Sequence, residues 1–273
     1  MTDPGPEHTS MLDLLTDGDL EVTGRLVRAS NGTFFGTVSA AGDAVECVYK
    51  PVRGERPLWD FPDGTLAARE RAAYLVSEAA DWHVVPPTVL RDGPFGFGMV
   101  QRWVDVDVSK PQVDVAPAAE SSRAGWFAVL DAYDAEDRPV QLLHRASASL
   151  RAMALFDAVV NNADRKGSHI LPEKGQPADG PVVGCDHGLT FHSELKLRTV
   201  LWGWSGESLE SDERARLTTL LDDIVRGPLR SALDPLLTPT EILALAERID
   251  DLLAEGVMPE PGDRWPTIPW PPL

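Results

Sequence analysis

Two aspartates in the middle of the chain each follow an apolar segment. Asp164 lies in VVNNADRKGSHIL, residues 159–171, and Asp186 lies in VVGCDHGLTF, residues 182–191. Phosphoryl transfer needs a carboxylate to orient the attacking hydroxyl and oxygen ligands to hold Mg²⁺ against nucleotide phosphates. Asp164, on a loop that leaves an apolar helix, is predicted for the first task. Asp186, between an apolar strand and Gly188, is predicted for the second.

A lysine and a glutamate nearer the N-terminus could complete such a site. Lys50 ends a predicted strand, and Glu70 lies on a predicted helix 20 residues later. A lysine that contacts phosphates needs a carboxylate to fix its flexible stem. Taken alone, each of these residues is more often an exposed surface residue. The prediction of a phosphoryl-transfer site therefore rests on the occurrence of all four residues, Lys50, Glu70, Asp164 and Asp186, in this order along the chain.

A glycine-bearing turn in SNGTFFGTV is a candidate phosphate-binding loop. Gly32 and Gly36 would let backbone N–H groups approach phosphate oxygens, and Ser30 lies beside them. The alternative is a simple hairpin turn, which is what most such stretches are. The turn supports a nucleotide site only together with Lys50 and Glu70.

The elements before residue 105 predict a small antiparallel lobe that carries one helix. After a flexible tail at 1–10, alternation and turn residues predict strands, and a segment poor in β-branched residues predicts a helix with Thr65 as its N-cap. The strands are expected at 21–29, 33–40, 44–50, 83–93 and 96–105, and the helix at 65–82. This N-lobe, residues 11–104, contains the glycine turn, Lys50, the Glu70 helix and a hinge strand.

The remainder predicts a larger helical lobe and a tail. Apolar spacing of i, i+3, i+4 and i+7 from Trp126 predicts a helix in 121–134, and long apolar stripes predict others. The expected helices after it are 139–160, 207–226 and 239–255. Residues 105–256 form this C-lobe, with the seam near 104–118. Six prolines exclude a helix in 257–273, so Trp265 and Trp270 are expected to lie against the C-lobe from an extended chain.

These motifs together resemble those of the phosphatidylinositol 3- and 4-kinase-like superfamily, including its bacterial HipA-like relatives. NNADRKGSHI is similar to the family's D-R-H-x-x-N catalytic loop, and CDHGLTF is similar to its D-F-G or D-x-G metal motif. The resemblance spans about residues 24–192 and implies an α+β, bilobal protein-kinase-like fold. It implies an ATP-dependent kinase, with ATP bound through the residues that follow: Ser30, Gly32, Gly36 and Lys50 on the phosphates, Glu70 pairing Lys50, and the strand with Met99, Gln101 and Trp103 flanking adenine. Asp164 would then be the catalytic base and Asp186 a Mg²⁺ ligand.

The chain departs from the family pattern at two positions. Lys166 replaces the usual histidine, and His169 replaces the usual metal-binding asparagine. Imidazole suits Mn²⁺ better than Mg²⁺, so His169 either binds a softer ion or points away and leaves the place to water. Asn161 or Asn162 could supply an amide oxygen instead or could cap the preceding helix. Arg165 could pair with a carboxylate or a phosphate.

Other functions use the same residues. A pseudokinase or nucleotide-binding interaction module would bind ATP without transfer, and an adenylyl transferase would leave AMP. A hydrolytic metal cluster of Asp186, His187, His192 and His169 fits no known ligand spacing. The acceptor of the phosphoryl group is not readable from the sequence, so a protein, a small molecule and a lipid headgroup all stay open.

Composition limits the partners. The formal net charge of −18 disfavours nucleic acid and anionic membrane surfaces. Cys47 and Cys185 have neither disulfide-framework nor metal-site spacing, and no stretch of 18 apolar residues occurs. We expect a cytoplasmic protein with no integral membrane segment, whose free cysteines are buried and whose WGWSG tryptophans, Trp202 and Trp204, pack in the core.

Overall fold

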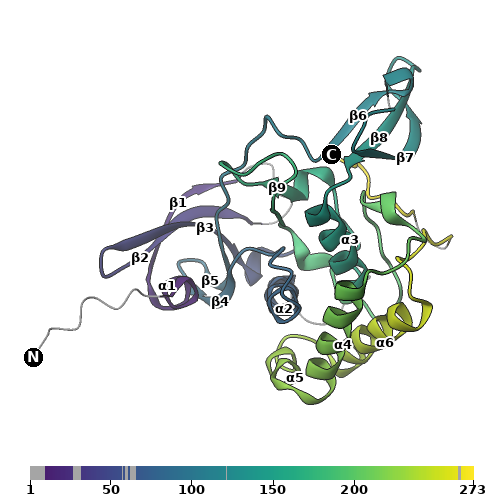
Figure 1. Ribbon diagram of the computed structural model, residues 1–273. Helices are drawn as coiled ribbons and strands as arrows, with labels where there is room; N and C mark the ends of the chain where they lie inside the picture. The colour runs from purple at the N-terminus through teal and green to yellow at the C-terminus, as the bar shows by residue number, and fades with distance from the viewer. Residues whose placement is uncertain are drawn as a thin grey trace, which may run out of the picture.

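The computed structural model describes residues 10–26, 32–56, 58, 61, 66–120, 122–263 and 266–273, which form a mixed α+β fold (Figure 1). Thr65, Ser30 and Trp265, which the sequence analysis singled out, lie outside these residues. In chain order the elements are α1 (Met11–Asp17), β1 (Asp19–Arg25), β2 (Phe34–Ala40), β3 (Asp43–Pro51), α2 (Leu66–Ala79), β4 (Thr88–Gly93), β5 (Gly96–Arg102), β6 (Val113–Pro117), β7 (Trp126–Tyr133), β8 (Pro139–Arg145), α3 (Ala148–Val160), β9 (Ile170–Pro172), β10 (Val182–Gly184), α4 (Ser211–Arg226), α5 (Pro228–Leu233) and α6 (Pro239–Glu255).

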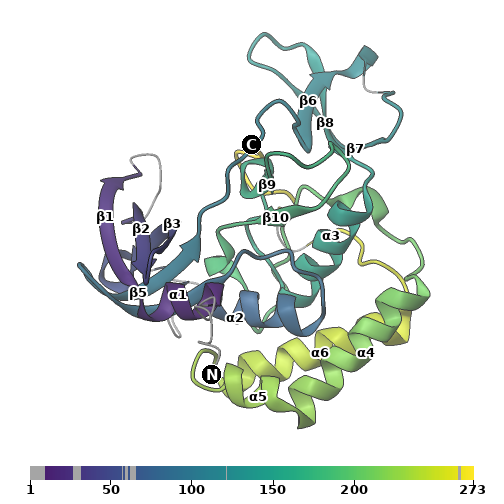
Figure 2. The same ribbon diagram turned by 60° about the vertical axis from the view of Figure 1, so that its left-hand side comes forward.

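The predicted small antiparallel sheet is confirmed. Its strand order is β1-β2-β3-β5-β4, and all neighbouring strands are antiparallel. Because side chains alternate along a strand, Tyr49 packs with Leu15 of α1 on one face while Lys50 faces the other. The helix α2 packs against β4 and β5. In Figure 2 this sheet lies apart from α4 and α6, with α2 between them.

The predicted helix in 121–134 is wrong. Residues 126–133 form β7, and the first part of the predicted helix 139–160 forms β8, so only Ala148–Val160 is helical. The apolar spacing from Trp126 does not mark one buried face, because Leu130 and Tyr133 are exposed, whereas Phe127 and Val129, two positions apart as in a strand, pack against the larger core. Periodicity alone does not distinguish a helix from a strand in so short an apolar segment.

A second sheet therefore stands within the expected helical lobe. It has the order β6-β8-β7 and projects from the end of the molecule near the C-terminal segment (Figure 1). Its β6 falls inside 104–118, the stretch that the sequence analysis assigned to the seam. Leu142 of β8, which is buried in the larger core, anchors the sheet to the rest of the fold.

The predicted C-terminal helices are confirmed as α4 and α6, and α5 between them was not expected. Capping boxes begin both α4 and α6, which is the reciprocal arrangement that satisfies free N–H groups at a helix start. Their apolar faces join α3 in the larger core. Within the described residues, no helix combines the length and apolarity needed to cross a membrane.

The C-terminal segment 266–273 contains no helix, as predicted. Pro269 is buried and Ile268 packs against the larger core. The expected packing of Trp270 is wrong, because its side chain is 76% exposed. The segment is instead held through backbone contacts, since Thr267 O accepts hydrogen bonds from Thr199 N and Trp202 Nε1 at 3.1 and 2.9 Å.

His144, on β8, is a buried pH-sensitive group that does not line the predicted site. Its Nδ1–H donates to Arg145 O, and Gly203 N donates to its Nε2, each at 2.9 Å, so the neutral ring is fully satisfied. Burial lowers its pKa from 6.5 to about 4. Protonation therefore opposes folding.

The expected consequence is a loss of stability as the pH falls below 6.5. Because the unfolded state binds the proton more readily, His144 should cost about 2 kcal/mol of unfolding free energy between pH 7.5 and pH 5. Urea unfolding at both pH values, for the wild type and His144→Gln, measures this. The variant should lose less stability than the wild type over that interval, and an equal loss in both proteins would contradict the assignment.

Candidate functional site

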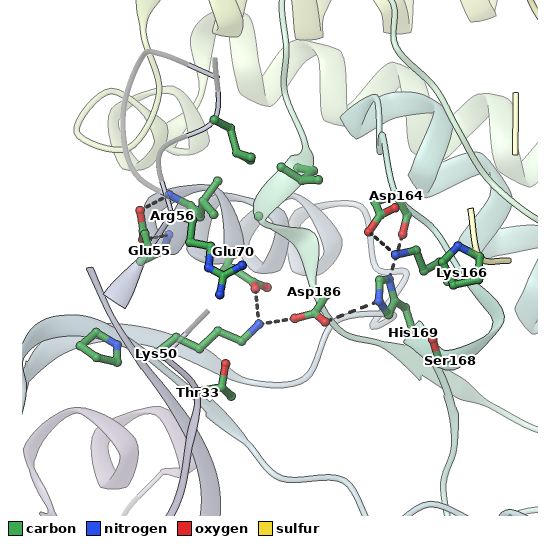
Figure 3. A pocket seen from close by; sticks show the side chains of 18 of the residues that line it. Thr33, Lys50, Glu55, Arg56, Glu70, Asp164, Lys166, Ser168, His169 and Asp186 are labelled. Carbon is green, nitrogen blue, oxygen red and sulfur yellow. Dashed lines mark hydrogen bonds and ion pairs between the residues drawn. The ribbon is translucent and has the colours of Figure 1, made fainter. Parts of the chain in front are cut away.

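A cavity of about 550 Å³ brings together residues from both halves of the chain (Figure 3). Lys50 and Glu70 reach it from the sheet and α2, while Asp164, His169 and Asp186 reach it from the loops after α3 and β10. The predicted phosphate, catalytic and metal residues therefore line one space, although up to 136 positions separate them.

Lys50 links the two halves electrostatically. Its Nζ lies 2.8 Å from Glu70 Oε1 and also donates to Asp186 Oδ1. Burial opposes the charge on Lys50, but the two carboxylates outweigh it and raise its pKa above the ordinary value. Lys50 is therefore a fixed cation, held by the glutamate that the sequence predicted.

Asp186 remains open toward the cavity. It follows β10 with φ +58°, in the left-handed region that aspartate tolerates, and 49% of its side chain is exposed. The positive charge of Lys50 holds the pKa of its carboxyl well below the usual range. An ionised, accessible carboxylate at this place is suited to bind a cation.

The loop that carries Asp164 is held by its own backbone and by two asparagines. Asn161 ends α3 in the left-handed conformation, and its amide oxygen accepts from Lys196 N at 2.8 Å. The Asn162 side chain accepts from Asp164 N at 3.0 Å and donates to Asp157 at 2.9 Å. Both amides are buried within the protein, so the capping alternative holds and neither oxygen is offered to a metal.

Asp164 points into the cavity beside a cation. Its Oδ2 lies 3.2 Å from Lys166 Nζ, and 24% of its side chain is exposed. Lys166 therefore places a positive charge next to the predicted base.

His169 presents a nitrogen lone pair to Asp186. Its Nδ1 must donate to Asp164 O, 2.8 Å away, because a carbonyl oxygen only accepts. Burial lowers its pKa, which favours the neutral ring, and the Nε2 of a neutral ring with its proton on Nδ1 is an acceptor. That atom faces another acceptor, Asp186 Oδ2, at 3.5 Å. Two facing acceptors fit a divalent cation that takes nitrogen and oxygen ligands.

Arg165 forms a structural ion pair with Asp157 and does not line the cavity. It is fully buried, as is Asp157, and its Nε and Nη2 atoms both bond that carboxylate, with the shortest distance 2.9 Å. The carboxylate alternative for Arg165 is therefore confirmed. A fully buried charge pair of this kind fixes the backbone on both sides of the residue.

Not every predicted residue reaches the cavity. Among the described residues that line it, Gly32 is present, whereas Gly36, Met99, Gln101 and Trp103 are not. A Cβ on Gly36 would lie 2.4 Å from Glu21 O, so this glycine permits close pairing of β1 and β2. Met99 and Gln101 are buried where α2 packs on the sheet, and Trp103 packs edge-on against Phe35.

Other residues line the cavity without a local sequence signal. Glu55 and Arg56 lie in a loop that was expected only as a connection, and Glu55 accepts from Leu66 N and Ala67 N at the start of α2. Pro271 and Leu273 form part of the wall near Asp164. Their segment is tied to the catalytic loop, because Gly167 N donates to Pro272 O at 2.8 Å.

Comparison with known proteins adds one relative. The chain is 49% identical over 267 residues to "Protein Rv2133c" of Mycobacterium tuberculosis (strain ATCC 25618 / H37Rv), covering 94% of each chain. The chain belongs to the Rv2133c family. No family model matches its sequence.

In this member of the Rv2133c family the hydrolytic metal cluster does not form. His187 is buried against Arg165, and His192 packs edge-on against Phe61 at 5.2 Å. In the part of the chain that the structure describes, no three His, Cys, Asp or Glu residues are grouped to hold a metal ion. A metal at Asp186 and His169 would need further ligands from water or substrate.

Cys47, Trp202 and Trp204 are buried packing groups outside the cavity, whereas Cys185 is only half-buried, contrary to the expectation for both cysteines. Burial raises the pKa of the Cys47 thiol to about 11 and that of Cys185 to about 12, so both are poor nucleophiles. Trp202 and Trp204 are 9% and 6% exposed, which confirms that WGWSG packs in the core.

Proposed function

We propose that this protein is an ATP-dependent phosphotransferase with a bilobal kinase-like fold, related to the phosphatidylinositol 3- and 4-kinase-like superfamily. The observation that carries the proposal is the cluster of Lys50, Glu70 and Asp186 in the same cavity as Asp164. A lysine fixed by a helix carboxylate, a metal-binding aspartate and a second aspartate are the parts that phosphoryl transfer uses.

Each residue has one role in this reaction. Lys50 contacts the nucleotide phosphates, and Glu70 keeps its stem in place. Asp164 orients the acceptor hydroxyl and takes its proton while the acceptor oxygen bonds to the γ-phosphorus and the bond to the β–γ bridging oxygen breaks, which releases ADP. Lys166 lies beside the transferred group, where its charge offsets the negative charge of the phosphoryl oxygens.

Asp186 and His169 would hold the divalent ion, which neutralises phosphate charge when bound. Their donor set is one carboxylate oxygen and one imidazole nitrogen, which favours Mn²⁺ over Mg²⁺. The net charge of −18 favours an uncharged hydroxyl acceptor over nucleic acid or an anionic bilayer, and two free cysteines accord with a cytoplasmic site of action.

A nucleotide-binding module without transfer is the second candidate. It is favoured by His169, because this side chain replaces the family's oxygen ligand and could leave the second metal position too weak for turnover. The identity of the phosphoryl acceptor stays open for the phosphotransferase.

The experiment that tests the proposal is a thermal shift assay with ATP, ADP and a non-hydrolysable ATP analogue, each with Mg²⁺ and with Mn²⁺. A ligand bound only by the folded state raises the melting temperature. The same samples are analysed for ADP, AMP and added protein mass. Stabilisation with ADP formation supports the phosphotransferase, AMP indicates adenylyl transfer, and stabilisation alone favours the second candidate. Lack of stabilisation by every nucleotide would refute both.

Asparagine at position 169 should change the metal preference. His169→Asn supplies an amide oxygen, a ligand that Mg²⁺ accepts, so the ratio of Mg²⁺-supported to Mn²⁺-supported turnover should rise about tenfold. The measurement is initial rate against metal concentration for the wild type and the variant. His83→Asn, a change at a histidine side chain that is 61% exposed, is the matched control and should leave the ratio unchanged. An unchanged ratio in His169→Asn would remove this residue from the metal site.

A further inference from the structure

His187 is a fully buried histidine between the two halves of the cavity, and the proposed reaction assigns it no part. It follows Asp186 directly, and its ring packs edge-on against Phe156 at 5.6 Å. A phenylalanine or leucine would fill such a place by packing alone. The polar contacts of the ring therefore need a separate explanation.

One ring nitrogen binds the arginine of the catalytic loop. Arg165 Nη2 lies 2.8 Å from His187 Nε2, and because a guanidinium only donates, Nε2 must accept. The ring proton is then on Nδ1. That atom has no hydrogen-bond partner among the described residues and lies 3.9 Å from Glu70 Oε2. The histidine accordingly accepts on the Arg165 side and turns its N–H edge toward Glu70.

The backbone of the same residue binds the other half of the site. His187 N donates to Glu70 Oε2 at 3.0 Å, while Glu70 Oε1 holds Lys50. Glu70 thus spans from the phosphate-binding lysine to the metal loop. Because Glu70 lies on α2, its bonds to Lys50 and to His187 N connect the β-sheet side of the cavity with the loop that follows β10.

The contacts continue from Arg165 to Asp164. Arg165 bonds Asp157, whose Oδ1 also accepts from Asn162 Nδ2, and the Asn162 oxygen accepts from Asp164 N. The series therefore runs from Lys50 through Glu70, His187, Arg165, Asp157 and Asn162 to Asp164. Since the side chains between Glu70 and Asn162 are buried, these bonds have little competition from water.

We propose that His187 is a positioning residue, whose ring accepts a hydrogen bond from Arg165 while its backbone donates to Glu70, so that Lys50 and Asp164 are held in one geometry. The inference rests on the proposed function for its catalytic consequence, and on contacts alone for its structural part. Loss of the acceptor on the ring leaves Arg165 Nη2 with Asp157 as its remaining partner on this side. One contact between the catalytic loop and the metal loop is then lost, while the bonds from Arg165 Nη1 to Cys185 O and from Cys185 N to His169 O remain.

Two variants of nearly equal length separate hydrogen bonding from packing. His187→Gln offers an oxygen that can accept from Arg165, whereas His187→Met fills the space but offers only a weak sulfur acceptor. With Mn²⁺ and ATP, the methionine variant should lose about 10- to 100-fold in kcat with little change in KM, because misplacement of a catalytic group has effects of this size. The glutamine variant should retain most of the rate.

Amide hydrogen exchange supplies a readout that needs no turnover. The amides of Arg165 and His169 should exchange faster in His187→Met than in His187→Gln or the wild type. His144→Met and His144→Gln are matched controls, because His144 is equally buried but takes no part in the series. Both should lower stability without changing exchange in the catalytic loop.

The outcomes separate this inference from the proposed function. Absence of ATP turnover in the wild type overturns the function, and the exchange data still decide the role of His187. The inference is overturned if the wild type turns over ATP and His187→Met matches His187→Gln both in kcat and in the amide exchange of the catalytic loop. If neither variant folds, ring ¹⁵N shifts of the wild-type protein decide, because an Nε2–H tautomer at His187 is incompatible with the Arg165 contact.

Discussion

Asparagine in place of Asp164 should lower the rate of ATP-dependent phosphoryl transfer by about 10²- to 10⁴-fold, the usual contribution of a positioned base. The amide cannot take the proton of the acceptor hydroxyl. Nucleotide binding should persist, because Lys50 and Asp186 are unchanged. ADP formation measured at saturating ATP, with thermal shift by the same nucleotide, tests both parts of this expectation.

Asp186→Asn is the informative companion of Asp164→Asn. Loss of the Asp186 carboxylate should abolish turnover and also remove the metal-dependent part of the thermal shift, since a neutral amide is a weaker ligand than a carboxylate. Asp251→Asn, at an exposed position on α6, is the control and should behave as the wild type. Turnover at the wild-type rate in Asp186→Asn would refute the assignment of the metal site.

Asp157→Asn should be the most destabilising of the conservative substitutions considered for this protein. Asp157 and Arg165 are both fully buried, and the carboxylate also accepts from Asn162 Nδ2 and Thr199 Oγ1. Removing its charge leaves a buried guanidinium without compensation, which costs about 3–5 kcal/mol of unfolding free energy. The urea midpoint should fall accordingly, with an unchanged slope if unfolding remains two-state.

The exposed pair of Arg230 and Asp234 provides the control for that experiment. Its Nε–Oδ1 distance is 2.8 Å, comparable with that of the buried pair, but its side chains are 42% and 54% exposed. Asp234→Asn should therefore cost about 0.2–1 kcal/mol. If the two variants lost equal stability, burial would not be what makes the Asp157 pair important.

The sequence alone predicted the elements whose signals are local. Alternation and turn residues located β1, β2 and β3 in their order, and helix-forming composition located α2. The pairing of Lys50 with Glu70 was expected from the resemblance to kinase folds, and the structure contains it. The assignment of Asp164 and Asp186 to one cavity depended on the family resemblance, and the geometry accords with it.

Tertiary structure decided the features that depend on distant contacts. The apolar residues of β7 follow a spacing that a helix could also have, so periodicity could not distinguish the strand from a helix until β8 supplied its partner. The packing of Pro271 and Leu273 beside the catalytic loop joins segments about 100 residues apart, and no local pattern encodes it. The same holds for His187, whose neighbours in sequence identify a metal loop, while its role depends on a guanidinium and a carboxylate that only folding brings to either side of it.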